Sequence, residues 1–405
     1  MKNWKSAVYV VSAIQIGAGM AIIGVMAFLP LFLSQIGITD SGEAAFWSGI
    51  LTAVTPLTLA ISSPFWSLEA KKRGAKPVMV MILLVVAVSA ILCSFTNSPW
   101  QLLVLRTAQG LAGGFIPIGL SIVTEITPEE KTSWAMGFFQ AALVAGTMLG
   151  PLAGGIVADI FGYRAPFLFF ALLLVLCALA TKFFLPEVNK TSDEKEDGSS
   201  MFSQIAYFIK IPEFRVLAAI QFLCNFGITG MGPIFPLYIE KMVGGEATAI
   251  ASLVGFLIFL SGGADALASL SAGTITQRFD MKKVLFVSTI FVGFTFIFQY
   301  LMTTVWGLGA FRVVTGLGIG IIMPITNTLI AKSVPPEKRS IVFGVVASIS
   351  MLGNVAGPAT SGVLAMYMGY ASVFWLTAFA FFLGGILFFI TDRRKKRYKF
   401  LDILR

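Results

Sequence analysis

The sequence repeats itself at a nearly constant spacing. Residues 105–111 read Leu-Arg-Thr-Ala-Gln-Gly-Leu, and 206 residues later, residues 311–317 read Phe-Arg-Val-Val-Thr-Gly-Leu. Further pairs at this spacing, or with one residue added, are Gln15 with Gln221, Pro30-Leu31-Phe32 with Pro236-Leu237-Tyr238, Gly146 with Gly353, Gly150-Pro151 with Gly357-Pro358, and Gly162-Tyr163 with Gly369-Tyr370. The chain therefore consists of two homologous halves, and in a membrane protein such symmetry places a binding site at the interface between them.

The composition is that of a membrane protein. Charged residues make up 12% of the chain, against about 25% in an average soluble domain, and the mean hydropathy is +0.88. A helix that crosses a bilayer needs about 20 apolar residues, and twelve segments satisfy this: 7–33, 44–66, 77–96, 99–122, 133–159, 165–185, 214–239, 247–271, 283–303, 305–331, 340–366 and 370–391. We expect an all-α membrane protein with twelve transmembrane helices in two pseudo-symmetric six-helix bundles.

The domain boundaries follow from a single polar stretch. Residues 187–212 contain a run of charged and small polar side chains that cannot bury a core. This stretch lies between the sixth and seventh predicted spans, where the repeat requires a junction. We expect an N-terminal bundle at 1–186, a cytoplasmic linker at 187–212, and a C-terminal bundle with a basic tail at 213–405.

The basic residues predict the orientation. With the N-terminus inside, 25 of the 29 Lys and Arg residues fall in cytoplasmic segments, including the tail run from Arg393 to Arg397. This excess places both termini in the cytoplasm of a multi-pass protein of the cytoplasmic membrane. This placement explains the net charge of +9 without nucleic-acid binding. The bilayer is therefore the expected partner of the basic tail. We also expect the protein to be a monomer.

The chain contains no histidine, which excludes Ser-His-Asp catalysis and histidine-liganded metals. Its three cysteines lie in predicted spans without CxxC spacing and are expected to be packed thiols. We therefore expect no enzyme activity and no metal or other cofactor, and any proton transfer must use carboxylates and hydroxyls.

A glycine motif lies in the fifth span. Glycines four residues apart share one helix face and allow a neighbouring backbone to approach closely, while a proline removes a backbone donor. The motif residues are Gly146, Gly150, Pro151, Gly154 and Gly155. The alternative interpretation is generic packing of small residues, but the weaker copy at 353–358 in the eleventh span favours a specific motif.

Two arginines lie inside predicted spans. Arg106 is followed by Gln109 and Gly110, and Arg312 repeats its position with Thr315 in place of the glutamine. A guanidinium inside a span costs about 2.5–3.5 kcal/mol on insertion scales, so it must face protein or water. Either Arg106 tunes a nearby proton site, or it is a structural clamp onto backbone carbonyls.

In their order along the whole chain, these motifs resemble those of the major facilitator superfamily and, within it, the twelve-helix drug:proton antiporters. The resemblance implies the facilitator fold and multidrug efflux by alternating access, with the proton gradient as driving force. It also implies that the helices carrying the glycine motif flank the interface between the halves.

The segment between the second and third spans departs from the family pattern G-x-L-A-D-R-x-G-R-K. Lys71 occupies the aspartate position, and a lysine cannot accept hydrogen bonds from helix-terminal amides as that aspartate does. The resemblance implies an interdomain latch, for which the candidates here are Glu69, Gly74 and, in the second half, Asp280. Either Glu69 substitutes for the aspartate from two residues away, or the latch is weakened. Glu125, at the end of the fourth span, fits the acidic position that joins this latch.

Of the 20 acidic residues, only Asp265 lies deep in a span. It stands eight residues before Gly273, or about 12 Å along a helix. A lone carboxylate at this depth could exchange protons near neutral pH. We expect proton coupling to involve Asp265, Arg106, Arg312 and Glu125. The alternative is that Asp265 serves packing, through a hydrogen bond to Ser261, Ser269 or a neighbouring helix.

The resemblance places the substrate cavity among the first, fourth, seventh and tenth spans. The candidates that line it are Gln15, Met20, Phe28, Gln109, Gln221, Asn225, Met231, Phe235, Tyr238 and Asn327. The 37 phenylalanines and 16 methionines suit an apolar, adaptable pocket. We expect a neutral or cationic lipophilic substrate, while Arg106 and Arg312 leave an anionic substrate open. The alternatives are a dedicated exporter of one metabolite, siderophore or lipid, and a non-transporting receptor or scaffold on the same fold.

Overall fold

The structure is a computed structural model that describes residues 4–185, 208, 210–244, 249–335 and 338–403, without the side chains of 340 and 393–403. Its long helices are α1 (Trp4–Ile23), α3 (Ser41–Arg73), α4 (Ala75–Ser94), α5 (Pro99–Leu111), α6 (Phe115–Ile126), α7 (Thr132–Phe161), α8 (Ala165–Phe184), α10 (Pro212–Gly230), α11 (Ile234–Val243), α12 (Ile250–Arg278), α13 (Met281–Leu301), α14 (Val305–Ser333), α15 (Arg339–Met368) and α16 (Tyr370–Ile403). Short helices η1 (Gly24–Ala27), α2 (Leu29–Gln35) and η2 (Glu129–Lys131) complete the series. Twelve candidate spans among the described residues confirm the predicted number and the all-helical class.

Four of these spans contain more than one helix. The first span joins α1 to η1 and the fifth joins η2 to α7, whereas the fourth breaks between α5 and α6 and the seventh breaks between α10 and α11. At the break in the fourth span, Ser62 and Trp66 of α3 donate hydrogen bonds to the carbonyls of Gly110 (3.1 Å) and Leu111 (2.5 Å). Because a bilayer offers no hydrogen bonds, such breaks are tolerated where neighbouring helices satisfy the freed carbonyls.

The second span is longer than the sequence suggested. Residues 67–73, expected in a loop between spans, form the last turns of α3. Glu69 and Arg73 form an ion pair one turn apart, and basic side chains in the last turn favour the helix dipole. Gly74, with φ +98°, ends the helix in a conformation that residues with a side chain rarely adopt.

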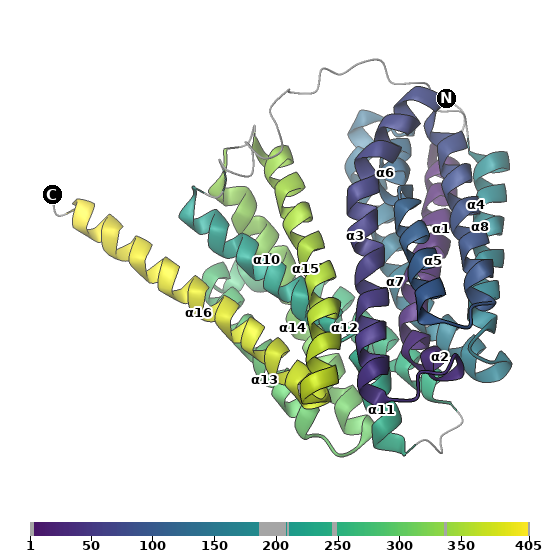
Figure 1. Ribbon diagram of the computed structural model, residues 1–405. Helices are drawn as coiled ribbons and strands as arrows, with labels where there is room; N and C mark the ends of the chain where they lie inside the picture. Colours follow the sequence, from purple (N-terminus) through teal and green to yellow (C-terminus); the bar gives the residue numbers. More distant parts are fainter. Residues whose placement is uncertain (1–3, 186–207, 209, 245–248, 336–337, 404–405) are drawn as a thin grey trace. The chain divides into compact units, whose positions relative to one another are not determined.

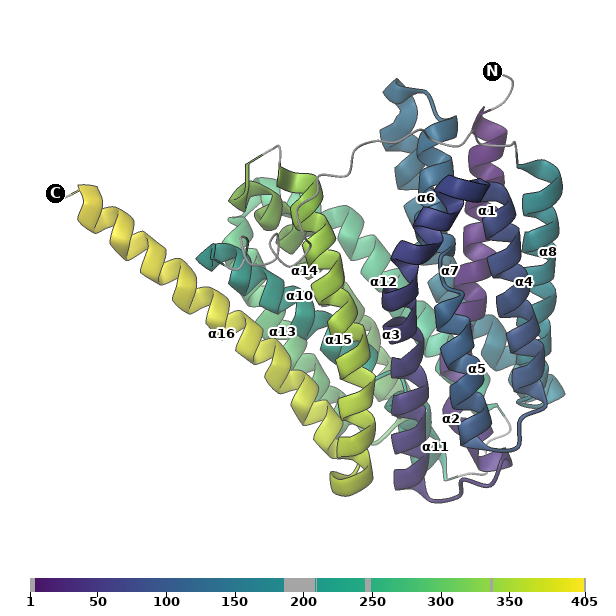
Figure 2. The ribbon, with the colours of Figure 1, turned by 45° about the horizontal axis from the view of Figure 1, so that its top comes forward.

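The contacts group the chain into two compact units. Unit 1 comprises Met1–Glu194 and Gly232–Phe259, and unit 2 comprises Lys195–Met231 and Leu260–Arg405. In unit 1, α1 packs against α7 and α8, α4 packs against α8, and α11 packs against α2 and α3. In unit 2, α10 packs against α15 and α16, and α13 packs against α14 and α16 (Figures 1 and 2). Most of the predicted linker lies outside the described residues.

The packing inside the units repeats the register found in the sequence. A Cβ built at Gly146 in α7 would lie 2.6 Å from the carbonyl oxygen of Ile16 in α1. A Cβ built at Gly353 in α15 would lie 2.6 Å from the carbonyl oxygen of Phe222 in α10. Ile16 and Phe222 are themselves 206 residues apart, so the same backbone-to-backbone contact is built twice.

Candidate transport and coupling site

The glycine motif allows α7 to touch two neighbours in unit 1. On one side, Cβ atoms built at Gly150 and Gly154 would lie 2.7 Å from the Met20 oxygen and 2.6 Å from the Gly24 oxygen. On the other side, a Cβ at Gly155 would overlap the carbonyl oxygen of Ala251 in α12. Only glycine permits these approaches, and the motif is therefore a contact surface for helices of both sequence halves.

Arg106 is 4% exposed and lies in α5. Its Nη1 donates to Oε1 of Gln109 at 3.1 Å, and the Gln109 amide contacts the Cys93 sulfur at 3.8 Å. The Arg106 Nε has no hydrogen-bond partner among the described residues, and no carboxylate there lies within 4.0 Å of its guanidinium. The charge is therefore held by a neutral amide inside unit 1.

The backbone at the two arginines is held alike. Thr55 donates to the carbonyl of Arg106 at 3.4 Å, and Ser261 donates to the carbonyl of Arg312 at 3.0 Å. Each hydroxyl comes from the span that follows the first helix of its repeat, at the 206-residue spacing. The scaffold around the half-buried Arg312 is thus a copy of that around Arg106.

The side chains next to the arginines differ. Thr315, which replaces Gln109, accepts a hydrogen bond from Gln299 Nε2 at 2.7 Å and lies 2.8 Å from the Thr295 hydroxyl. Gln299 in turn takes the repeat position of Cys93. In the second repeat, Thr315 therefore forms hydrogen bonds with Gln299 and Thr295. In the first repeat, the amide oxygen of Gln109 accepts a hydrogen bond from the arginine instead.

Asp265 lies near the middle of α12 in unit 2 and is half-buried. Its backbone carbonyl packs against Gly320 of α14, where a Cβ would overlap that oxygen. Within the described part of the chain, no hydrogen bond or ion pair reaches its carboxylate; the nearest candidate by sequence, Ser261, donates to Arg312 instead. Asp265 is therefore partly exposed, and within the described part of the chain its carboxylate has no fixed partner.

The predicted cavity residues divide between the units. Gln15, Met20, Phe28, Gln109, Phe235 and Tyr238 belong to unit 1, and Gln221, Asn225, Met231 and Asn327 belong to unit 2. Gln221 donates to Asn327 at 2.7 Å, and Asn225 donates to the Gln221 carbonyl at 2.8 Å. Phe28 packs its ring edge-to-face on Phe167 in the unit 1 core.

Gln15 differs from its repeat partner Gln221. It is fully buried, and neither atom of its amide group has a hydrogen-bond partner among the described residues. The first-half position equivalent to Asn327 is Ser121, whose hydroxyl donates to Glu125 at 3.0 Å. The hydrogen bond that joins Gln221 to Asn327 in unit 2 therefore has no counterpart at Gln15.

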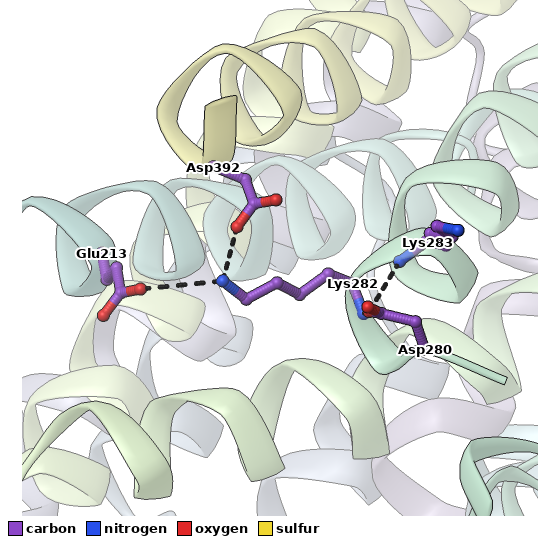
Figure 3. Close-up of polar contacts among 5 residues, drawn as sticks. All are labelled: Glu213, Asp280, Lys282, Lys283 and Asp392. Carbon is purple, nitrogen blue, oxygen red and sulfur yellow. Dashed lines mark hydrogen bonds and ion pairs between the residues drawn. The ribbon is translucent and has the colours of Figure 1, made fainter. Parts of the chain in front are cut away.

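The predicted latch residues have local roles within their units. Glu69 pairs with Arg73 in the last turns of α3, and Gly74 terminates that helix. Asp280 caps α13 by accepting from the backbone N–H groups of Lys282 (2.7 Å) and Lys283 (3.4 Å), as Figure 3 shows.

A polar cluster in unit 2 was missed by the sequence reasoning. The ammonium of Lys282 lies 2.5 Å from Asp392 in α16 and 3.9 Å from Glu213 in α10 (Figure 3). The three side chains border a cavity of about 220 Å³, whose other lining residues are Val216, Leu217, Leu329, Lys332, Ser333, Phe388 and Thr391. None of the predicted substrate residues lines this cavity.

The lysine also has a repeat partner. Lys76, 206 residues earlier, donates to the carbonyl oxygen of Leu185 at 2.7 Å, at the end of α8. In each repeat, a lysine near the start of the third helix of the bundle thus binds a group at the end of the sixth. The 206-residue spacing could have identified Lys76 and Lys282 as repeat partners, but not the groups that they contact.

Comparison with known proteins decides the family. The profile of the Major Facilitator Superfamily matches residues 11–264 and 217–402. The chain belongs to the major facilitator superfamily. It is 30% identical over 400 residues to the multidrug resistance protein MdtG of Proteus mirabilis, covering 98% of both chains, and 30% identical over 395 residues to that of Citrobacter koseri, covering 97% of both.

Two solved transporter structures share the fold. A bacterial homolog of the human lysosomal transporter Spinster, in an inward-facing and occupied conformation, matches with a TM-score of 0.79 at 16% identity, over 97% of this chain and 98% of that one. The human organic anion transporter MFSD10 matches with a TM-score of 0.63 at 18% identity, over 96% of this chain and 100% of that one. At these identities the likeness concerns the fold alone, and it supports the prediction of a facilitator architecture.

Proposed function

We propose that the chain is a secondary active transporter that exports lipophilic small molecules in exchange for protons by alternating access. Its full-length similarity to proteins named for multidrug resistance supports efflux. The observation that carries the proton-coupling part of the proposal is the state of Asp265, a half-buried carboxylate without a fixed partner in the middle of a spanning helix.

The position of Asp265 supports a coupling role on energetic grounds. It stands 13 residues before Arg278 at the end of α12, or about 20 Å along the helix. A charged carboxylate at such depth is costly, so uptake of a proton removes a large desolvation penalty. Because binding and release of this proton change the charge of α12, the residue is suited to bias a conformational equilibrium.

The polar residues of the predicted cavity support a neutral or cationic substrate. Gln15 offers a buried amide, and Gln221 with Asn327 offers a second amide pair in unit 2. Amides supply both donors and acceptors without fixed charge. Two other predicted cavity residues, Phe28 and Met231, are apolar and are buried in this structure. Pockets lined by apolar side chains with a few polar groups bind lipophilic compounds.

The proposal also covers the orientation, the domain division, the assisting residues and the oligomeric state of the transporter. In this proposal both termini lie in the cytoplasm, and the two bundles comprise residues 1–186 and 213–405, as the duplication predicts. Arg106, Arg312 and Glu125 assist coupling, whereas Glu69, Gly74 and Asp280 form the cytoplasmic latch region. The transporter functions as a monomer in the cytoplasmic membrane.

The test is transport of a fluorescent lipophilic cation, such as ethidium, into proteoliposomes under an imposed pH gradient. Asp265→Asn should abolish accumulation driven by the gradient while preserving exchange of labelled for unlabelled cation without a gradient. Asp40→Asn is the matched control, since Asp40 is an exposed carboxylate that only caps α3 through the Glu43 N–H at 2.8 Å.

Full gradient-driven accumulation by Asp265→Asn refutes the coupling assignment. Competition by many unrelated lipophilic compounds supports multidrug export, and saturation by a single compound class contradicts it. A protein that shows no flux of any tested compound under any gradient contradicts the transport proposal itself.

A further inference from the structure

A carboxylate in α7 binds the beginning of α12. Asp159 Oδ2 accepts a hydrogen bond from the backbone N–H of Ser252 at 2.6 Å, and its Oδ1 accepts from that of Ala251 at 3.3 Å. Ala251 and Ser252 are the second and third residues of α12, a helix that begins at Ile250. The first N–H groups of a helix have no partner within it and carry a partial positive charge, so a carboxylate is the preferred partner there.

The backbones next to this carboxylate are in direct contact. A Cβ at Gly155 of α7 would overlap the carbonyl oxygen of Ala251, and a Cβ at Gly255 of α12 would overlap that of Pro151. The two glycines thus face each other's helix, and no side chain separates α7 from the first turns of α12. Asp159 stands one turn beyond Gly155 and closes this contact at its end.

The contact joins the two sequence halves inside one compact unit. Residues 232–259 belong to the second repeat but pack in unit 1 with the helices of the first. The position in the second repeat that corresponds to Asp159 is Met366, which offers no strong acceptor. The duplication therefore does not explain Asp159.

Asp159 and a second carboxylate both act on Tyr163, which follows the end of α7. The pKa of the half-buried Tyr163 hydroxyl is raised above its ordinary value by burial and by the carboxylates of Asp159 and Glu240. Glu240 comes from α11, another second-repeat element within unit 1. The Asp159 carboxylate is favoured by the positive end of α12, whereas the Glu240 carboxylate, which acts on the same tyrosine, opposes a second negative charge there.

We propose that Asp159 is a gate latch: its carboxylate holds the first turn of α12 against the end of α7, and the contact breaks and reforms in each transport cycle. With the termini inside, this end of α7 faces outward, so the latch closes the protein to the outside. The proposal rests on the transport function proposed above. Asp159 is a positioning residue, since it acts on the helices and not on substrate.

The test measures access from outside to a buried site next to the latch. Val254 is fully buried and lies three residues after Ala251, on the same face of α12. Val254→Cys provides a buried thiol one turn from Ala251, and we expect a membrane-impermeant maleimide to reach it faster when α12 separates from α7. The native Cys93, Cys177 and Cys224 are buried, and the protein without Val254→Cys supplies the baseline.

Asp159→Asn keeps the shape but replaces one acceptor oxygen by a donor that faces a backbone N–H. Loss of a hydrogen bond to a charged group changes an equilibrium roughly tenfold or more. We expect Asp159→Asn to raise the labelling rate about tenfold, and Gly155→Ala to raise it as well by forcing the backbones apart. Asp40→Asn, which alters a cap within a single helix, should leave the rate unchanged.

An unchanged labelling rate in Asp159→Asn overturns the proposal, as does an equal rise in Asp40→Asn. A second measurement uses Asp159→Cys with Ser252→Cys. Oxidation should cross-link the pair and stop transport, with recovery on reduction; undiminished transport by the cross-linked protein overturns the latch. Labelling needs no substrate, so failure of the latch and failure of the transport proposal are distinguished.

Discussion

The duplicated glycine contact predicts a paired effect on stability. Alanine at Gly146 or Gly353 places a Cβ 2.6 Å from a backbone carbonyl oxygen, of Ile16 in α1 or of Phe222 in α10. Ordinary van der Waals contact begins at 3.4 Å, so the helices must separate by about 0.8 Å. Neither obstructing atom is the end of a flexible side chain, and the strain cannot be relieved by a change of rotamer.

The same two helices supply matched controls. Gly137 in α7 and Gly344 in α15 have no atom within 4 Å of a built Cβ, and they are themselves repeat partners. At these positions alanine gains only helix propensity, up to about 1 kcal/mol relative to glycine. At Gly146 and Gly353 the same gain is opposed by overpacking that costs about 1–3 kcal/mol, so the difference between test and control isolates the strain.

The assay is thermal unfolding of the purified protein in detergent, followed by tryptophan fluorescence at one fixed scan rate. At about 2–4 °C per kcal/mol, Gly353→Ala should melt roughly 2–12 °C below Gly344→Ala. Gly146→Ala should likewise melt below Gly137→Ala. Equal melting temperatures within either pair would refute the reasoning that backbone contact, and not glycine flexibility, explains the motif.

Three further predictions concern charged and titratable groups. Arg106→Lys should leave the melting temperature near that of the parent but impair transport, because lysine lacks the guanidinium Nη1 that donates to Gln109; unchanged transport leaves only a structural role. Lys282→Met should lower the free energy of unfolding by about 1–3 kcal/mol, between the values for exposed and buried pairs, and Asp392→Asn should then add little in a double-mutant cycle. Since the pKa of Tyr163 is raised from 10.0, the folded state keeps its proton longer, and stability should fall as pH rises above about 10. Tyr163→Phe should remove that part of the alkaline decline in melting temperature, and an identical decline contradicts the shift.

Membrane placement and duplication could be predicted from the sequence because both are linear properties. A segment of about 20 apolar residues must be helical in a bilayer whatever surrounds it, which is why all twelve spans were found. The motif glycines at 146 and 353 likewise predicted close helix contacts, since a residue with a side chain would prevent such an approach. Less was predictable at the helix ends. The hydrophilic residues 67–73 were expected to form a loop outside the membrane, but a hydrophilic segment can still be helical, and the Glu69–Arg73 ion pair stabilises this one.

The candidate site was predictable in its residue types but not in its pairings. Asp265 could be predicted because a carboxylate deep in a span is rare. That Ser261 donates its hydrogen bond to Arg312 and not to Asp265 could be learned only from the structure. Gln109 and Thr315 occupy one repeat position, yet they bind different groups. A repeat fixes where a side chain stands on its helix, whereas the neighbours across the interface select its partner.

The sequence by itself determined the membrane class, the twelve helices and the twofold plan of this protein, because hydropathy and spacing act locally along the chain. Only the tertiary structure decided that Lys282 meets Asp392, 110 residues away, and that Asp159 meets Ser252, 93 residues away. Such polar contacts depend on the axial register and rotation of packed helices. A shift of one residue rotates a helical side chain by about 100°, so no local pattern encodes them.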